Sequence, residues 1–219
     1  YEIHERLVGS EMCIRDRIPT VLDLVRKGES FDLEDMARVG YNGVVCVEAG
    51  GPVPGFGCAG RGIIAALEEL EKKGAYEKYQ PDVVIYDVLG DVVCGGFSMP
   101  MRKGYADKVF IITSGESMSV YAAANIAMAV ENFKSRGYAS LGGFILNKRN
   151  VKNEEGKAAE LAADFHSSVI AEIDRSDLVS EAEDMRKTVM EAFPDSTAAE
   201  QYRALADKIA ELCGMGEEK

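Results

Sequence analysis

The sequence predicts an α/β fold whose sheet is mainly parallel and is covered by helices on both faces. Short apolar runs are typical of strands that are buried in such a sheet. Helical patterns stand between these runs, and the alternation of strand and helix indicates parallel strand–helix–strand units. In such folds the loops at the carboxyl ends of the strands carry the chemistry. The expected strands are residues 43–48, 82–87, 108–113, 141–146 and 169–173.

The expected helices carry apolar residues at helical spacing and are bounded by residues that begin or end a helix. A glycine closes the first three of them, and a serine that can cap the first turn opens the last two. They are residues 20–28, 60–74, 117–137, 176–192 and 196–212.

Composition places the chain in a broad class. It has 219 residues, of which 47% are hydrophobic and 28% are charged, so it can bury one sizeable core. The formal net charge of -12 disfavours broad contact with nucleic acid or with an anionic membrane surface. No run approaches the ~20 apolar residues of a membrane span, and the N-terminus lacks the layout of a secretory signal. We expect a cytoplasmic protein with no nucleic-acid or membrane partner.

Five cysteines and two histidines are the residues best suited to hold a metal. Cytoplasmic cysteines stay reduced, so those with a special role bind metal or react rather than form disulfides. His4 and His166 are too few for a His-rich site or a Ser-His-Asp triad, and we expect His166 on the surface. Cys46 lies inside an apolar run and is expected in the core. Cys213, near the C-terminus, has no neighbours that suggest a role.

The first 17 residues show no sustained hydrophobic period. We interpret residues 1–17 as a non-native leader, with a genuine N-terminal arm as the alternative. Cys13 and His4 are therefore excluded from functional reasoning. The α/β domain is expected over residues 18–213 and a disordered tail over residues 214–219.

The first candidate site follows the expected strand at residues 82–87. An acid at the end of an apolar strand, with a glycine three residues later, is an arrangement of phosphate-cleaving P-loop proteins. Asp87 can hold the water shell of a magnesium ion, and the Gly90 backbone N–H can donate to a γ-phosphate. Asp91 stands where it can orient a water molecule. The alternative is an acid that only caps the following turn.

The second candidate site is residues 48–62, with six glycines and two prolines. Cys58 lies in its centre, just before a helix N-terminus, where backbone N–H groups and the helix dipole favour anionic sulfur. Cys94 lies beside glycines in the loop after Asp87. The alternative is a tight connection without a site. Two thiolates are too few for an iron-sulfur cluster or a closed zinc site, but a two-fold dimer would supply four.

Four segments carry a resemblance to one family. On these segments the sequence resembles the nitrogenase iron protein family, the dinitrogenase reductases, with a likeness from about residue 18 to residue 213. The resemblance implies a P-loop NTPase-like fold of the deviant Walker type. No segment resembles GxxxxGK[ST], so we expect the first strand and its P-loop to be missing. The segments are residues 46–63, 86–102, 112–126 and 141–150.

The resemblance also implies an activity. The family's homodimer binds MgATP in each subunit and holds one [4Fe-4S] cluster between the subunits. It passes single electrons to a dinitrogenase component of the molybdenum-iron type or an alternative type, which reduces N2 to ammonia. Reduced ferredoxin or flavodoxin is the implied electron source.

Site residues follow from the matched motifs. Cys58 and Cys94 match the cluster ligands. Asp87 matches the magnesium-side switch, and Asp91 matches the residue that activates water. Arg61 lies in the partner-docking patch and matches an arginine that some organisms ADP-ribosylate. The implied nucleotide contacts are Gly90, Asn147, Glu183 and Tyr202.

Two departures from the family pattern limit these expectations. Without a P-loop lysine and its backbone cradle, γ-phosphate binding loses most of its charge stabilisation. We therefore expect the 219-residue chain not to hydrolyse ATP at the family's rate. Residues 173–179 also depart from an expected proline-arginine-aspartate pattern, which puts Arg175 in doubt as a nucleotide contact.

Two alternative functions stay open at this point. One is a nitrogenase-like, ATP-dependent reductase that acts on a tetrapyrrole-maturation partner, such as one in nickel-cofactor synthesis. The other is a partitioning or septum-placing ATPase of the deviant Walker type without a cluster, which would not need Cys58 and Cys94.

Overall fold

The structure is a computed structural model. It describes residues 19–28, 30–50, 60–88, 90, 100–102 and 104–215, with only the backbone for residues 60–62. The predicted leader at residues 1–17 and the end of the predicted tail, residues 216–219, lie outside this description.

The chain divides into two compact units, each described by itself. In the described part, the first unit holds the residues up to Asp87 together with residues 181–192. The second unit holds the remaining residues from Val88 to Ser180 and from Phe193 onward.

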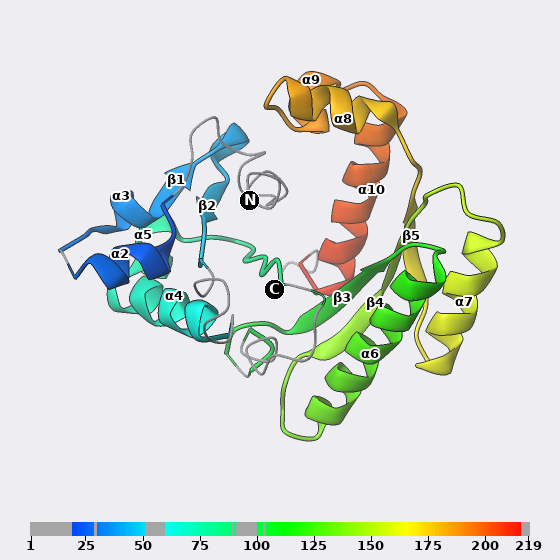
Figure 1. Ribbon diagram of the computed structural model, residues 1–219, viewed down its shortest axis with the longest axis horizontal. Helices are drawn as coiled ribbons and strands as arrows, with labels where there is room; N and C mark the ends of the chain where they lie inside the picture. Colours follow the sequence, from blue (N-terminus) through cyan, green and yellow to red (C-terminus); the bar gives the residue numbers. More distant parts are fainter. Residues whose placement is uncertain are drawn as a thin grey trace. The chain divides into compact units, whose positions relative to one another are not determined.

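The second unit contains the predicted parallel sheet. Its strand order is β3-β4-β5, and both pairings are parallel. Helices α6 and α7 lie on one side of this sheet and α10 lies on the other (Figure 1). The elements are β3 (Lys108–Thr113), α6 (Ser117–Lys134), β4 (Ser140–Asn147), α7 (Glu154–Asp164), β5 (Val169–Ile173) and α10 (Thr197–Leu212). The predicted α/β fold with a helix-flanked parallel sheet is therefore confirmed.

The core of the second unit lies between the sheet and helices α6 and α7. Phe144 of β4 is fully buried, and its ring lies 6.3 Å from that of Phe165. Small residues on the helices let them approach the strands closely. The buried residues of this core are Ile111, Ala123, Ala127, Phe144, Leu161 and Ala162.

The first unit is built from short elements. Its core is formed by Val21, Leu33, Met36, Ala66 and Ala75. The elements are α2 (Val21–Lys27), α3 (Leu33–Met36), β1 (Ala37–Val39), the 3-10 helix η2 (Tyr41–Gly43), β2 (Val45–Val47), α4 (Gly60–Lys72), α5 (Ala75–Tyr79) and α9 (Val189–Ala192). Helix α8 (Asp177–Asp184) begins in the second unit and ends in the first.

Two predicted parallel strands are wrong. β2, within the predicted strand 43–48, pairs antiparallel with β1. The short turn at Tyr41–Gly43 allows this, because antiparallel neighbours need only a tight connection. Residues 82–87 form no strand, and Ile85 is 85% exposed. Among the described residues no strand pairs with this run, and an apolar composition does not supply a hydrogen-bonding partner.

The predicted helix at residues 176–192 is interrupted. Ser176 opens it as expected, since its Oγ accepts a hydrogen bond from the Leu178 N–H at 3.3 Å. Arg186, at φ +55°, adopts the left-handed conformation beyond the end of α8. The Lys187 N–H then donates to the Ala182 carbonyl at 2.9 Å, a bond that closes a helix C-terminus. The result is two helices, α8 and α9.

Three described α-helices were missing from the sequence prediction, the short α3 and α5 and the longer α7. Helix α7 carries few large apolar residues, and Gly156 in its first turn lowers its helix propensity. Buried Leu161 and two buried alanines nevertheless pack it against the sheet. Tertiary packing therefore decides the conformation of this segment.

Gly115, after β3, packs against the first turn of α7. A Cβ atom at this position would lie 2.1 Å from Glu154 Cβ and 2.7 Å from Glu154 Cα. We expect Gly115→Ala to lower the free energy of unfolding by about 1–3 kcal/mol, because the loop or the helix must shift. Urea unfolding followed by circular dichroism measures this loss.

Gly137→Ala is the matched control, because Gly137 has φ +74° and nothing lies within 4 Å of an added Cβ. It carries only the backbone cost of a left-handed residue, about 1 kcal/mol. A Gly115→Ala variant no less stable than this control would contradict the packing.

Candidate functional site

The carboxyl ends of the parallel strands β4 and β5 meet at one edge of the sheet. Asn147 ends β4 and is in register with Ile173, which ends β5. The backbone N–H of Lys148 donates to the Ile173 carbonyl at 2.8 Å. This pairing places Asn147 and Asp174, which directly follows Ile173, on neighbouring strand ends.

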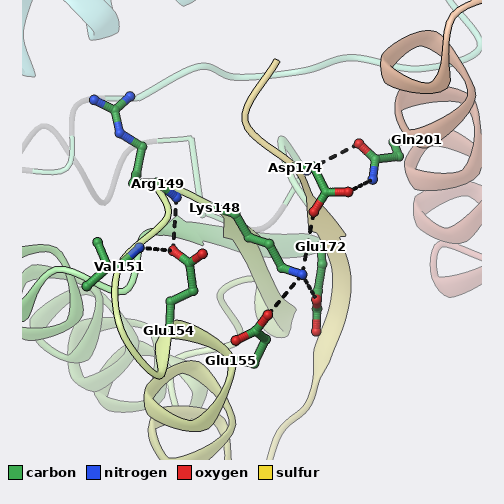
Figure 2. Close-up of polar contacts among 8 residues, drawn as sticks. All are labelled: Lys148, Arg149, Val151, Glu154, Glu155, Glu172, Asp174 and Gln201. Atoms are coloured by element: carbon green, nitrogen blue, oxygen red, sulfur yellow. Dashed lines mark hydrogen bonds and ion pairs between the residues drawn. The ribbon is translucent and has the colours of Figure 1, made fainter.

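Lys148 supplies a positive charge at the edge where β4 and β5 end. Its Nζ lies 2.7 Å from Glu172, 3.1 Å from Glu155 and 3.5 Å from Asp174 (Figure 2). Its side chain is only 20% exposed. The hydrogen bonds to Glu172, and then to Glu155, raise the pKa of Lys148 well above its ordinary value. The ammonium group is therefore charged at every physiological pH.

Asp174 links the end of β5 to helix α10. Its backbone N–H donates to Gln201 Oε1 at 3.2 Å, and Gln201 Nε2 donates to the Asp174 carboxylate at 2.8 Å (Figure 2). Tyr202 follows Gln201 and is 36% exposed. Burial raises the pKa of the Tyr202 phenol, so its hydroxyl group keeps its proton and can donate.

Glu154 fixes the loop that follows Asn147. The residue is 5% exposed, and its carboxylate accepts hydrogen bonds from the backbone N–H groups of Arg149 at 2.9 Å and Val151 at 3.3 Å (Figure 2). Next to it, Lys157 Nζ donates to the Gly115 carbonyl at 2.7 Å. The loops after β3 and β4 are thus both tied to the first turns of α7.

The loop after β3 is ordered by side-chain hydrogen bonds. The Ser114 N–H donates to Ser119 Oγ at 2.9 Å, and Ser114 Oγ donates to the Glu116 carboxylate at 2.9 Å. These bonds hold the start of α6 against the end of β3. The edge therefore presents three strand ends with fixed loops.

Of the predicted nucleotide contacts, the structure places three in the second unit. Asn147 ends β4, and Tyr202 lies on α10, which Gln201 links to Asp174 at the end of β5. Gly90 lies beside α6, since a Cβ atom added to it would be 3.7 Å from Ile126 Cδ1.

Two other predicted residues belong to the first unit. Asp87 is exposed and is the last residue of the first chain segment of that unit. Glu183 is exposed on α8, and its carbonyl accepts a hydrogen bond from the Arg186 N–H at 2.8 Å.

The predicted cluster ligands Cys58 and Cys94, and also Asp91, lie outside the described residues, as does the side chain of Arg61. In the described ranges no group of three His, Cys, Asp or Glu residues could hold a metal ion. The other cysteines there match their expectations, with Cys46 7% exposed in the core and Cys213 exposed. His166 is also exposed, as expected.

Sequence reasoning missed the polar network around Lys148. Its members are Lys148, Glu154, Glu155, Glu172, Asp174 and Gln201. Each looked like an ordinary charged or polar surface residue, and Gln201 is 27 positions from its partner Asp174. The only available signal was position, because Lys148 and Asp174 each directly follow a strand.

None of the described helices is both long enough and apolar enough to cross a membrane.

Comparison with solved structures supports the fold. The cell division ATPase MinD of Pyrococcus furiosus superposes with a TM-score of 0.65 at 17% identity, over 93% of this chain and 80% of that chain. MinD of Pyrococcus horikoshii OT3, solved in complex with Mg-ADP, superposes with a TM-score of 0.66 at 16% identity, over 96% of this chain and 81% of that chain. Identities this low show a shared fold and no more.

Comparison with known sequences identifies the family. The nitrogenase iron protein of Methanospirillum hungatei JF-1 is 51% identical over 196 residues, which are 88% of this chain and 69% of that protein. Nitrogenase iron protein 2 of Methanothermobacter thermautotrophicus is 48% identical over 194 residues, 89% of this chain and 71% of that protein. Residues 10–214 match the family described as 4Fe-4S iron sulfur cluster binding proteins, NifH/frxC family. The chain therefore belongs to the NifH/frxC family of 4Fe-4S iron-sulfur cluster binding proteins.

Proposed function

We propose that the chain is the ATP-dependent reductase component of a nitrogenase. It would pass single electrons from a [4Fe-4S] cluster, held between two copies of the chain, to a dinitrogenase component that reduces N2 to ammonia. The observation that carries the proposal is the pair Cys58 and Cys94, each beside glycines, in a chain of a cluster-binding family. We propose that it acts in the cytoplasm, where thiols stay reduced.

The donor set fits such a cluster. Four thiolates hold a [4Fe-4S] cluster. Apart from Cys13 in the predicted leader, each chain offers two cysteines that neither the core nor the exposed end of α10 accounts for. A two-fold dimer would bring Cys58 and Cys94 of both copies together. When bound, the cluster supplies one-electron transfer. The neighbouring glycines would let backbone N–H groups approach the sulfurs, and such hydrogen bonds would tune the reduction potential.

The proposed partners are a dinitrogenase component, which accepts the electron, and a small electron donor. We propose that Arg61, three residues after Cys58, lies in the surface that docks the dinitrogenase component and is a candidate for ADP-ribosylation. Each docking event would move one electron to the dinitrogenase component, of the molybdenum-iron or an alternative type. Reduced ferredoxin or flavodoxin would return one electron and complete the cycle.

We propose that an adenine nucleotide binds at the carboxyl edge of the second unit. The Asn147 carboxamide offers both a donor and an acceptor to the base edge. Tyr202 adds a protonated phenol on α10. The support for a nucleotide is the shared fold with a MinD protein that was solved in complex with Mg-ADP.

Three other predicted residues would act on the phosphate side. Asp87 would hold the magnesium shell, Gly90 would donate its N–H to the γ-phosphate and Asp91 would orient water. Glu183 would add a contact to the nucleotide base. The 219 residues contain no GxxxxGK[ST] motif. For this chain we therefore propose nucleotide binding rather than ATP hydrolysis at the family's rate.

Two alternatives remain. A reductase that serves a tetrapyrrole-maturation partner would use the same cysteines and nucleotide, so only the partner separates it from a nitrogenase. A cluster-free partitioning ATPase is favoured by one observation, the shared fold with the MinD proteins. Iron and sulfide analysis separates this second alternative from both reductases.

Replacement of the cysteines tests the cluster directly. After anaerobic reconstitution, the unaltered chain should bind about two iron and two sulfide per chain, since a [4Fe-4S] cluster is shared by two copies. Cys58→Ser and Cys94→Ser should each lose most of this iron and the brown colour. Iron, sulfide and visible absorbance are the readouts.

Cys213→Ser is the matched control, because Cys213 is an exposed cysteine at the end of α10. It should keep the full iron content. A colourless unaltered chain, or iron that is retained in Cys58→Ser and lost in Cys213→Ser, would rule out the proposed ligands.

Replacement of Asn147 tests the base site. We expect Asn147→Ala to weaken MgADP binding about fivefold, the cost of one neutral hydrogen bond, and to reduce the preference for MgADP over MgGDP. Isothermal titration calorimetry with both nucleotides measures the two effects. Asn132→Ala, on an exposed position of α6, is the control and should bind as the unaltered chain does. Equal affinities for all three chains would remove Asn147 from the site.

A further inference from the structure

The Lys148 side chain joins β5 and α7 to the end of β4 through ion pairs. Glu172 and Asp174 lie on and just after β5, and Glu155 lies on the first turn of α7. In the described part of the chain, every ion pair of these three carboxylates goes to Lys148. One cation therefore holds together three anions that would otherwise repel one another at close range.

The network continues from Lys148 to helix α10. Asp174, the third carboxylate, exchanges two hydrogen bonds with Gln201. Gln201 is the sequence neighbour of Tyr202, and Lys148 is the sequence neighbour of Asn147. The contacts drawn in Figure 2 thus connect Lys148 with Gln201, the sequence neighbours of the two residues that the proposed function assigns to the base.

A second set of hydrogen bonds, which does not involve the Lys148 side chain, holds the loop after β4. The buried Glu154 carboxylate binds the backbone N–H groups of Arg149 and Val151. The Lys148 N–H bond to the Ile173 carbonyl belongs to the backbone and does not need the ammonium group. Loss of the Lys148 charge would therefore leave the fold of the loop and the strand pairing in place. What it would change is the position of the Asp174 carboxylate and, through Gln201, that of α10.

We propose that Lys148 is a positioning residue that holds Asn147 and Tyr202 in the arrangement that binds the nucleotide base. The inference rests on the proposed function for the identity of its ligand. Without the ammonium group, repulsion among the carboxylates moves Asp174, and Gln201 carries Tyr202 with it. The base then meets Asn147 and Tyr202 at a spacing that no longer fits adenine better than guanine.

The test compares Lys148→Met with Lys148→Arg in the 219-residue chain. Lys148→Met keeps most of the apolar length of the side chain and loses the charge. We expect it to weaken MgADP binding about tenfold, the size of effect seen when residues of one charged network lose their interaction energy. It should also reduce the ratio of MgADP affinity to MgGDP affinity. Lys148→Arg, whose guanidinium group can pair with two carboxylates, should restore both values to within about threefold.

Lys148→Gln provides a second neutral variant, because its amide can donate hydrogen bonds to the carboxylates but carries no charge. It should lower affinity and selectivity as Lys148→Met does. If Lys148→Met does not fold, Lys148→Gln and Lys148→Arg still decide the question. Lys148→Gln with unaltered affinity and selectivity would then overturn the inference.

Lys208→Met is the control. Lys208 pairs with Glu211 at 2.8 Å on the same helix as Tyr202, with no link to Asp174. Its nucleotide affinity and selectivity should match those of the unaltered chain. Hydrogen exchange of the peptide that contains Asp174 supplies a readout without nucleotide. Exchange should rise in Lys148→Met and stay unchanged in Lys148→Arg and Lys208→Met.

The outcomes separate this inference from the proposed function. If the unaltered chain binds MgADP and Lys148→Met binds it with the same affinity and selectivity, the inference is overturned and the proposed base site stays intact. An unaltered chain that binds neither nucleotide contradicts the base site, and the inference falls with it. A loss in Lys148→Met that Lys148→Arg does not restore also overturns the positioning role, because the charge would not be its cause.

Discussion

The parallel pairing of β4 with β5 is the constraint on which the candidate site depends. Its register places Asn147 beside Ile173, and the Lys148 N–H bond to the Ile173 carbonyl extends the pairing one residue beyond the strand. Lys148 and Asp174 can meet only because both strands end at this level. A shift of one residue would turn their side chains to opposite faces of the sheet. The ion pairs and the link to α10 follow from this register.

The strands of this sheet were predictable because their sequences satisfy the physical needs of a buried strand. β3, β4 and β5 are apolar and bounded by turn residues, and helices cover both faces of the sheet. Residues 82–87 have the same composition but form no strand in the described structure. An apolar run indicates that burial of the segment is favourable. It does not indicate which neighbouring strand provides the hydrogen bonds. β2 shows the same limit, since its antiparallel partner follows from a short turn.

The candidate site was predictable only in part. Asn147 and Tyr202 came from the resemblance to a family, because in the sequence they are an ordinary strand-end and helix residue. Lys148, Asp174 and Gln201 gave no such signal, since their contacts join segments that are 26 and 27 positions apart. Cys58 and Cys94 stood out through their glycine-rich surroundings. The described residues leave them as a prediction that the family match supports.

The central claim is that two copies of this chain share one [4Fe-4S] cluster, and native mass spectrometry tests it most directly. Chain reconstituted anaerobically with iron and sulfide is sprayed without denaturation, and the masses of the intact species are read. We expect a species of two chains plus about four iron and four sulfide, which separates into single, iron-free chains when a chelator removes the iron. A single chain that keeps iron, or a two-chain species without iron, would contradict it.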